Sequence, residues 1–265
     1  MVSNFLPNEE HLCAGTNTVR MNTSSYAAPA GRRVWRNVQL PCRCQTAVRL
    51  FVVDLLAERE AFGRAGVTEI VKHYTPDETL LWSPHTDQRL DYGFGEVVDG
   101  PVEADAIVIT GSRRNVSMWE PWMDAVVDLI QNAQVPLYGI CFGHQIVAKA
   151  LGGRVERAEI DSHFVAEVHQ SDGNSVVASF AHQEHVVDPG ELEVIASAAH
   201  CKIAACKHPT RPIRTVQYHP EVVASVLDVA LACGEMNEAE RAGYVHQRLT
   251  TDVAVAFGLN DNQFR

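Results

Sequence analysis

The segment Gly139-Ile140-Cys141-Phe142-Gly143 constrains the fold of this chain more than any other. It follows the apolar run 135–140 and precedes a helical pattern that ends at Gly152-Gly153. A sharp turn between strand and helix needs very small residues two places before and after its centre, because the two elements approach closely there. The sequence therefore predicts a strand–turn–helix elbow with Cys141 at its apex.

Apolar runs and helical patterns alternate along the chain around this elbow. Strands are predicted at about 48–53, 106–109 and 135–140, and helices at about 55–65, from about 121 onward and after the elbow. This alternation predicts a parallel sheet covered by helices on both faces. Shorter strand patterns follow at 176–177, 192–195 and 213–218. The predicted fold class is α/β, with a mostly parallel central sheet and a mixed, strand-rich second half.

Three segments are expected from these patterns. Residues 1–45 show neither a helical nor a strand period and predict an irregular arm, residues 46–232 form the α/β domain, and residues 233–265 form a helical extension. Within the extension, Asn237 and Glu240 have the spacing of a capping box, which predicts a last helix of about 238–257.

Composition limits the partners of this chain. Lys and Arg total 22 and Asp and Glu total 33, a net charge of −11, which disfavours nucleic-acid backbones and anionic membrane surfaces as partners. No run has the apolar length of a membrane helix or the pattern of a signal peptide, so a cytoplasmic location is expected.

The seven cysteines are odd in number and scattered, which favours free thiols over a disulfide framework. Cys42-Arg43-Cys44 is too closely spaced for the usual zinc pair and has no second pair in range. The sequence therefore predicts no metal site and no cofactor.

Cys141 has the position of a nucleophile. The N–H groups and the dipole at the start of the following helix favour a thiolate over a thiol. The N–H of Phe142 is placed to bind the oxyanion of a tetrahedral intermediate. A buried structural cysteine is the alternative, and the two flanking glycines argue against it.

His219 and Glu221 lie where the apolar run 213–218 ends and a helix is expected to begin. Side chains at the carboxyl ends of parallel strands converge at one edge of a sheet. An imidazole there can exchange protons with the Cys141 thiol, and a carboxylate two residues on can hold its tautomer. The predicted catalytic triad is Cys141, His219 and Glu221. Most of the other histidines, of twelve in all, are expected at the surface or in loops.

Four motifs in order then resemble a known family. They are Gly139-Ile140-Cys141-Phe142-Gly143-His144-Gln145, Leu151-Gly152-Gly153, Ala181-His182-Gln183-Glu184 and Tyr218-His219-Pro220-Glu221. Their order and spacing resemble a class I glutamine amidotransferase domain over about residues 48–229. Thr110-Gly111-Ser112 and Glu120-Pro121-Trp122 are most similar to stand-alone proteins of the type of the GMP synthase amidotransferase domain.

The resemblance implies a flavodoxin-like three-layer sandwich and hydrolysis of the glutamine γ-amide through a γ-glutamyl thioester on Cys141. It implies that the N–H of Gly111 joins that of Phe142 in an oxyanion hole, and that Gln145, His182 and Gln183 hold the substrate. Gln145 and His182 have an alternative interpretation, in which they cap and pack the elbow.

Two departures from the family pattern bear on the substrate. Gly111-Ser112-Arg113-Arg114 replaces the Gly-Gly-Pro loop of many amidotransferases, and its two cations are able to attract a second carboxylate. Residues 158–163 replace the usual lead-in to the glutamine-binding strands.

Three functions therefore compete. The first is a glutamine amidotransferase that supplies ammonia to a separate ATP-dependent synthetase, because the chain carries no G-x-x-x-x-G-K-[ST] loop of its own. The second is a stand-alone γ-glutamyl peptidase or hydrolase that cleaves glutathione-like conjugates. The third is a non-catalytic regulatory protein that has kept the fold, against which the intact triad argues.

Overall fold

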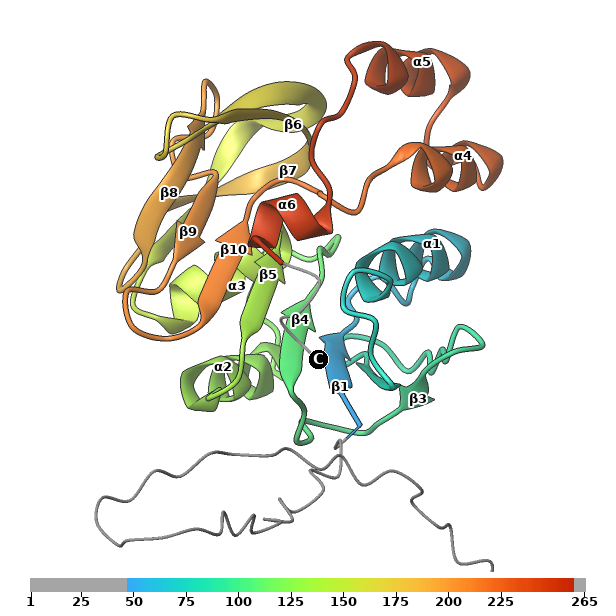
Figure 1. Ribbon diagram of the computed structural model, residues 1–265, viewed down its shortest axis with the longest axis vertical. Helices are drawn as coiled ribbons and strands as arrows, with labels where there is room; N and C mark the ends of the chain where they lie inside the picture. Colours follow the sequence, from blue (N-terminus) through green and yellow to red (C-terminus); the bar gives the residue numbers. More distant parts are fainter. Residues whose placement is uncertain (1–46, 260–265) are drawn as a thin grey trace, which may run out of the picture. The chain divides into compact units, whose positions relative to one another are not determined.

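The computed structural model describes residues 47–259 of the 265-residue chain. The expected arm at 1–45 and the Cys42-Arg43-Cys44 segment lie outside these residues. Within them, ten strands form one sheet in the order β3-β2-β1-β4-β5-β10-β9-β8-β6-β7 (Figure 1). The strands are β1 Arg49–Val53, β2 Glu78–Trp82, β3 Glu96–Val97, β4 Ala106–Ile109, β5 Leu137–Ile140, β6 Arg154–Gln170, β7 Ser175–Asp188, β8 Glu193–Ala198, β9 Ala205–Lys207 and β10 Ile213–Val216. The helices are α1 Glu60–Val71, α2 Trp122–Asn132, α3 Phe142–Ala150, α4 Ala224–Ala232, α5 Glu238–His246 and α6 Val253–Phe257.

The sheet has a parallel half and an antiparallel half. Strands β3, β2, β1, β4, β5 and β10 pair in parallel, and β9, β8, β6 and β7 continue the sheet antiparallel. The predicted α/β class with a strand-rich second half is confirmed. The hairpin of β6 and β7 is much longer than the short strands expected there, since charged and small polar residues along β6 obscure its alternation.

Each face of the parallel half carries its own hydrophobic core, because successive side chains of a strand point to opposite faces. In β1, Leu50 and Val52 pack with residues of α1 and α6. Phe51 and Val53 pack on the other face with residues of α2 and α3. Helices therefore cover both faces, which is the three-layer arrangement predicted from the alternation.

Helix α1 begins five residues later than predicted and continues through Gly66. The carboxylate of Asp54 accepts a hydrogen bond from the N–H of Leu56 at 2.9 Å, which holds a turn after β1 instead of a first helical turn. Gly66 lies within the helix because a Cβ at that position would be 3.3 Å from Cδ1 of Leu56. The glycine thus permits close packing of α1 on the turn.

The prediction of a single last helix at about 238–257 is wrong, since α5 and α6 are separate helices. The capping box that starts α5 is confirmed, with Asn237 and Glu240 exchanging hydrogen bonds. The helix stops because the following segment pairs with the edge of β7. The Thr250 N–H donates to the Val177 carbonyl at 3.0 Å, and the Val177 N–H donates to Oγ1 of Thr250 at 2.8 Å.

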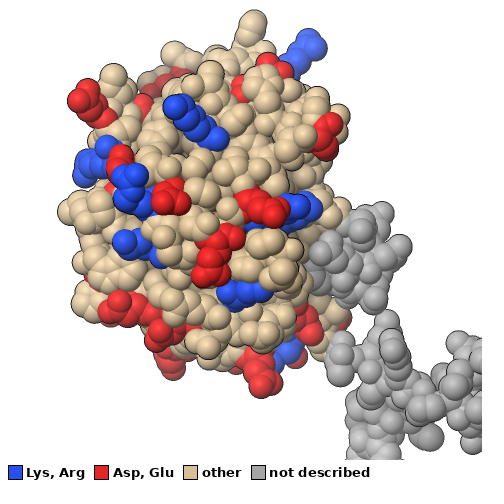
Figure 2. Space-filling view, turned by 90° about the vertical axis from the view of Figure 1, so that its left-hand side faces the viewer, with Lys and Arg blue, Asp and Glu red and all other residues tan. Residues whose placement is uncertain are grey.

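Acidic and basic side chains are interspersed on the face of the molecule seen in Figure 2, which shows no purely basic stripe among its described residues. Between residues 47 and 259, no helix has the length and hydropathy needed to cross a membrane.

Candidate active site

Cys141 occupies the sharp turn between β5 and α3 that the sequence predicts. Its backbone has φ 51° and ψ −99°, a conformation that costs free energy for any residue with a side chain. The two glycines of the elbow leave no room for a Cβ. One added to Gly139 would lie 2.7 Å from the carbonyl carbon of Gly143, and one added to Gly143 would lie 2.3 Å from the carbonyl oxygen of Ile109. The close contact of strand and helix therefore keeps Cys141 strained.

His219 and Glu221 lie beside this turn, just after β10. Nδ1 of His219 is 2.8 Å from Oε1 of Glu221, and the Glu221 side chain is only 1% exposed. The His219 N–H is anchored to the Ser179 carbonyl at 2.8 Å, which ties this loop to β7. The geometry is that of a carboxylate fixing an imidazole in one orientation.

Electrostatics couple His219 to both of its neighbours. Burial lowers the pKa of His219, but the charges of Cys141 and Glu221, together with hydrogen bonds to both, outweigh burial and raise it well above its ordinary value. A raised histidine pKa beside a thiol favours the thiolate–imidazolium pair. The structure thus brings the three predicted triad residues together.

The predicted oxyanion donors lie next to the same atoms. A Cβ added to Gly111 would lie 2.8 Å from Cε1 of His219 and 3.5 Å from Cβ of Cys141, so the Gly111 backbone borders both groups. Within residues 47–259, no intramolecular hydrogen bond occupies the N–H of Gly111 or that of Phe142. Two free donors therefore flank Cys141.

The three predicted substrate-binding residues lie in two different environments. His182 and Gln183 line a cavity next to His219. Gln145 is buried, and its amide donates to the Glu184 carbonyl at 2.8 Å and to Oε1 of Gln217 at 3.3 Å. Gln217 in turn approaches Sγ of Cys141 at 3.7 Å. Gln145 thus has the surroundings of a residue that holds the turn at Cys141 in place through hydrogen bonds.

Glu184 has a structural role that the sequence did not indicate. Its buried carboxylate accepts the N–H of Val116 at 2.6 Å and that of Ser117 at 3.1 Å. These bonds fix the loop between β4 and α2, which carries Gly111. The only signal in the sequence was that Glu184 directly follows His182-Gln183.

The cavity beside His219 has a volume of about 490 Å³. Its wall includes residues of the loops after β1 and β4, of the hairpin β6–β7, and of the C-terminal segment that carries Glu235, Met236 and Tyr244. Tyr244 of α5 interacts with Ser179 at this wall, and burial raises its pKa. Part of the segment expected to be a separate helical extension therefore lines the candidate site.

The two arginines that depart from the family pattern are already paired. Arg113 forms an ion pair with Glu235, which also binds Arg59 at 2.8 Å, and Arg114 pairs with Glu58. The hydrogen bond from Arg59 is the main cause that lowers the pKa of Glu235. These pairs neutralise the charge that was expected to attract a second carboxylate.

The prediction that most remaining histidines lie at the surface or in loops is wrong for His144 and His182, which are buried within α3 and β7. His85 is also buried, but it lies in the loop after β2. Burial lowers the pKa of His144 to about 4 and, together with His185, that of His182 to about 3. The helical and strand patterns around these residues would have placed His144 and His182 in the interior.

Comparison with known proteins agrees with this geometry. The sequence profile of the family described as glutamine amidotransferase class-I matches residues 64–235, more than half of the chain. The chain belongs to the class I glutamine amidotransferase family. This membership confirms the resemblance of its four motifs, and the match extends into the segment that carries Glu235.

Curated relatives of this amidotransferase-family chain include one of the subunits of glutamine-hydrolyzing GMP synthase, from two archaea. The protein of Methanothermobacter thermautotrophicus is 35% identical over 105 residues, which cover 36% of this chain and 56% of that protein. That of Methanocaldococcus jannaschii is 36% identical over 105 residues, with the same coverage. The chain spans about half the length of the curated relatives it matches.

Solved structures share the fold at lower identity. A glutamine amidotransferase from Thermotoga maritima aligns with a TM-score of 0.60 at 16% identity, covering 77% of this chain and 91% of that one. A glutamine amidotransferase from Methylobacillus flagellatus aligns with a TM-score of 0.55 at 16% identity, covering 80% of this chain and 85% of that one. At such identities the similarity establishes the flavodoxin-like fold of the family.

Proposed function

We propose that this protein hydrolyses the γ-amide of glutamine and delivers the ammonia to a separate ATP-dependent synthetase. One observation carries the proposal above the others. The strained Cys141, the coupled His219 and the buried Glu221 adjoin a cavity with two free backbone donors beside the thiol. Family membership and the relation to a glutamine-hydrolyzing GMP synthase protein support the choice of substrate.

In the proposed reaction, the Cys141 thiolate attacks the amide carbon and forms the carbon–sulfur bond. The N–H groups of Gly111 and Phe142 bind the resulting oxyanion. Imidazolium His219 gives its proton to the amide nitrogen, the carbon–nitrogen bond breaks, and ammonia leaves. Neutral His219 then takes a proton from a water molecule as its oxygen attacks the thioester carbon. The carbon–sulfur bond breaks, which releases glutamate and restores the Cys141 thiolate. Glu221 holds the His219 imidazole in position throughout.

For substrate binding we propose His182 and Gln183 at the cavity wall. We assign Gln145 a supporting role in place of the substrate contact implied by the resemblance. Both amide hydrogen bonds of Gln145 go to protein groups, one of them Gln217 behind Cys141. Gln145→Ala is therefore expected to lower kcat through a misplaced Cys141 more than it raises KM.

A cleavage of γ-glutamyl conjugates remains the second candidate, and the cavity is the observation that favours it. Leu56, Phe62, Leu227 and Met236 give it an apolar wall, and 490 Å³ lies within the range of sites that take ligands larger than an amino acid. A γ-glutamyl compound with an apolar group beyond the scissile bond would fill this space.

The test measures glutamate release from glutamine and, separately, from γ-glutamyl peptides. Cys141→Ala is expected to abolish release, and Cys206→Ser, which removes another buried thiol, to leave it unchanged. Release from peptides alone would replace the first candidate by the second. Because a synthetase can gate turnover, the protein is also treated with a glutamine-mimicking electrophile, and the modified residue is identified by mass spectrometry. Turnover retained by Cys141→Ala, or absence of glutamine-protected labelling at Cys141, contradicts the proposal.

A further inference from the structure

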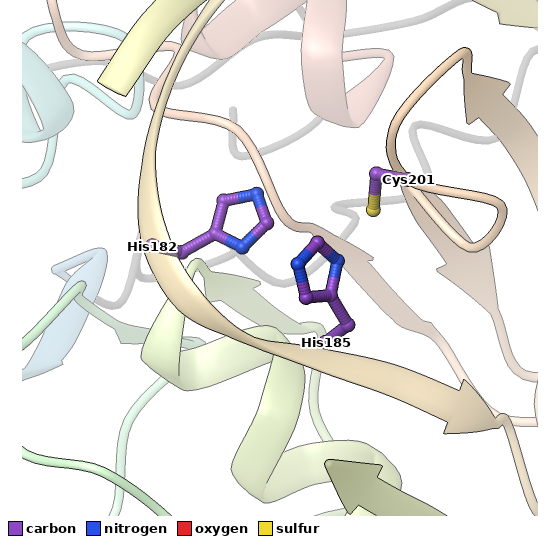
Figure 3. Close-up of side chains that lie close together, drawn as sticks. All are labelled: His182, His185 and Cys201. Carbon is purple, nitrogen blue, oxygen red and sulfur yellow. The ribbon is translucent and has the colours of Figure 1, made fainter. Parts of the chain in front are cut away.

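A second cluster of reactive side chains lies on the hairpin side of the elbow. His182 and His185 extend from β7, and Cys201 extends from the loop between β8 and β9 (Figure 3). One nitrogen of each histidine and Sγ of Cys201 all lie within 4.8 Å of one another. The segments that carry them are brought together by the antiparallel half of the sheet.

The hydrogen bonds of His182 leave one of its ring nitrogens without a partner among the described residues. Nδ1 is 3.0 Å from the Glu184 carbonyl, so it carries the proton and donates it. Nε2 is then a bare acceptor, and it is buried with no hydrogen-bond partner among the described residues. A buried acceptor without a partner loses free energy relative to water. A histidine that donates through one nitrogen to a backbone carbonyl is typical of metal ligands, because this bond fixes the tautomer and the ring.

Cys201 is buried on the far side of the cluster, with 1% of its surface exposed. Its thiol donates only a weak hydrogen bond, to the Ile203 carbonyl at 3.4 Å. His185 is half-buried, and its ring lies 4.5 Å from that of His182, centroid to centroid, at an angle of 73°. Small movements of these side chains would bring three ligand atoms to the distances of about 2.0–2.3 Å that zinc requires.

We propose that His182, His185 and Cys201 bind a zinc ion. Two imidazoles and one thiolate form a ligand set that suits zinc, whereas Mg²⁺ and Ca²⁺ prefer oxygen ligands. Binding replaces the Cys201 S–H bond by an S–Zn bond and releases the proton to solvent, with no change in oxidation state. Three protein ligands leave one position for water. The sequence predicted no metal site because these residues are three and sixteen positions apart, outside the usual spacing of zinc motifs.

Zinc in this position would join β7 to the loop at 199–204. His182 also lines the cavity beside His219, so the metal would hold one wall of that cavity in place. The inference does not depend on glutamine hydrolysis, since the ligands are separate from the triad. With Nδ1 bonded to the Glu184 carbonyl and Nε2 to the metal, His182 would act on the substrate by shaping the cavity wall, and Gln183 would supply the polar contact.

The test titrates the full-length protein with Co²⁺, followed by absorption spectra, and then displaces Co²⁺ with Zn²⁺. A Cys141→Ala background removes the thiol of the candidate active site as a competing ligand. One equivalent of Co²⁺ is expected to give the intense visible bands of tetrahedral cobalt and a thiolate-to-cobalt charge-transfer band in the near ultraviolet. Cys201→Ser is expected to remove the charge-transfer band.

Two further variants keep the test decisive if Cys201→Ser does not fold. His185→Gln changes a half-buried residue and is expected to weaken Co²⁺ binding by more than about tenfold. Loss of a group that only hydrogen-bonds to a metal ligand already weakens binding about tenfold, and His185 is proposed as a ligand itself. Cys206→Ser is the matched control with a buried thiol outside the cluster, and it should bind as the parent does. Two results would overturn the proposal. One is the absence of a tetrahedral cobalt spectrum from folded protein. The other is a spectrum that persists in both Cys201→Ser and His185→Gln but vanishes in a Cys42→Ser, Cys44→Ser double variant.

Discussion

Replacing His144 by Asn is expected to make the stability of this protein less sensitive to acid. His144 lies in α3, fully buried, with Nδ1 2.8 Å from Oγ1 of Thr215, and burial lowers its pKa to about 4 despite an opposing interaction with the Ile203 backbone. A histidine in an unfolded chain has a pKa of about 6.5. Between these two values the unfolded chain binds the proton and the folded protein does not. The free energy of unfolding is therefore not reduced by His144 above about pH 6.5, and it falls as the pH drops from about 6.5 toward 4.

The size of the effect follows from the two pKa values. One pKa unit corresponds to about 1.4 kcal/mol, so acidification from neutral pH to about pH 5 removes about 2 kcal/mol through this residue. Asparagine has no proton to bind, and it can keep a hydrogen bond to Thr215. The variant will be less stable at neutral pH, because it leaves part of the imidazole volume unfilled. The prediction therefore concerns the difference between the two pH values.

The assay is urea unfolding near neutral pH and at about pH 5 for the parent, for His144→Asn and for the control His246→Asn, which removes an exposed imidazole at the end of α5. The loss of free energy of unfolding on acidification should be about 2 kcal/mol smaller in His144→Asn than in the parent, and unchanged in the control. Equal losses in all three proteins would refute the reasoning, since burial would then not exclude the proton.

Two more predictions concern the elbow and its supports. Gly143→Ala should destabilise the protein by several kcal/mol, because the added Cβ would lie 2.3 Å from the Ile109 carbonyl oxygen. The control Gly243→Ala changes an exposed helical site with open space around it, and it should stabilise the protein by about 0.5–1 kcal/mol. Thermal unfolding checks both, and a similar change in the two variants would contradict the geometry. Glu184→Gln should loosen residues 112–121 and lower glutamate release while retaining the fold, because a neutral amide replaces the carboxylate that accepts two backbone N–H groups. Faster hydrogen exchange confined to this loop would support that role, and unchanged exchange would exclude it.

The parts of the fold that were predictable are those in which local pattern and tertiary role agree. Strands β1, β4 and β5 are buried on both faces and form continuous apolar runs. The elbow needs its two glycines whatever surrounds it. The start of α1 was misplaced because the Asp54 side chain competes for backbone hydrogen bonds, which apolar spacing does not reveal. The extent of β6 was missed since an outer hairpin tolerates charged residues on both faces.

The candidate site divides in the same way. The proximity of Cys141, His219 and Glu221 could be predicted because each follows a strand end with recognisable neighbours. Glu184, Tyr244 and the ligand cluster of His185 and Cys201 were not predicted, because their roles depend on contacts between distant segments. For Gln145 the family resemblance implied a substrate contact and left a packing role open, and its hydrogen bonds favour the packing role.

The pairing of Thr250 with Val177 has a consequence for where this domain ends. Strand β7 is the last in the sheet, and an uncovered strand edge is a template for pairing with other chains. The family match stops at residue 235, fifteen residues before the segment that covers this edge. A protein shortened to the family limit would expose the edge and lose the α5 wall of the cavity together. Resistance to aggregation therefore resides in residues that the family pattern does not include.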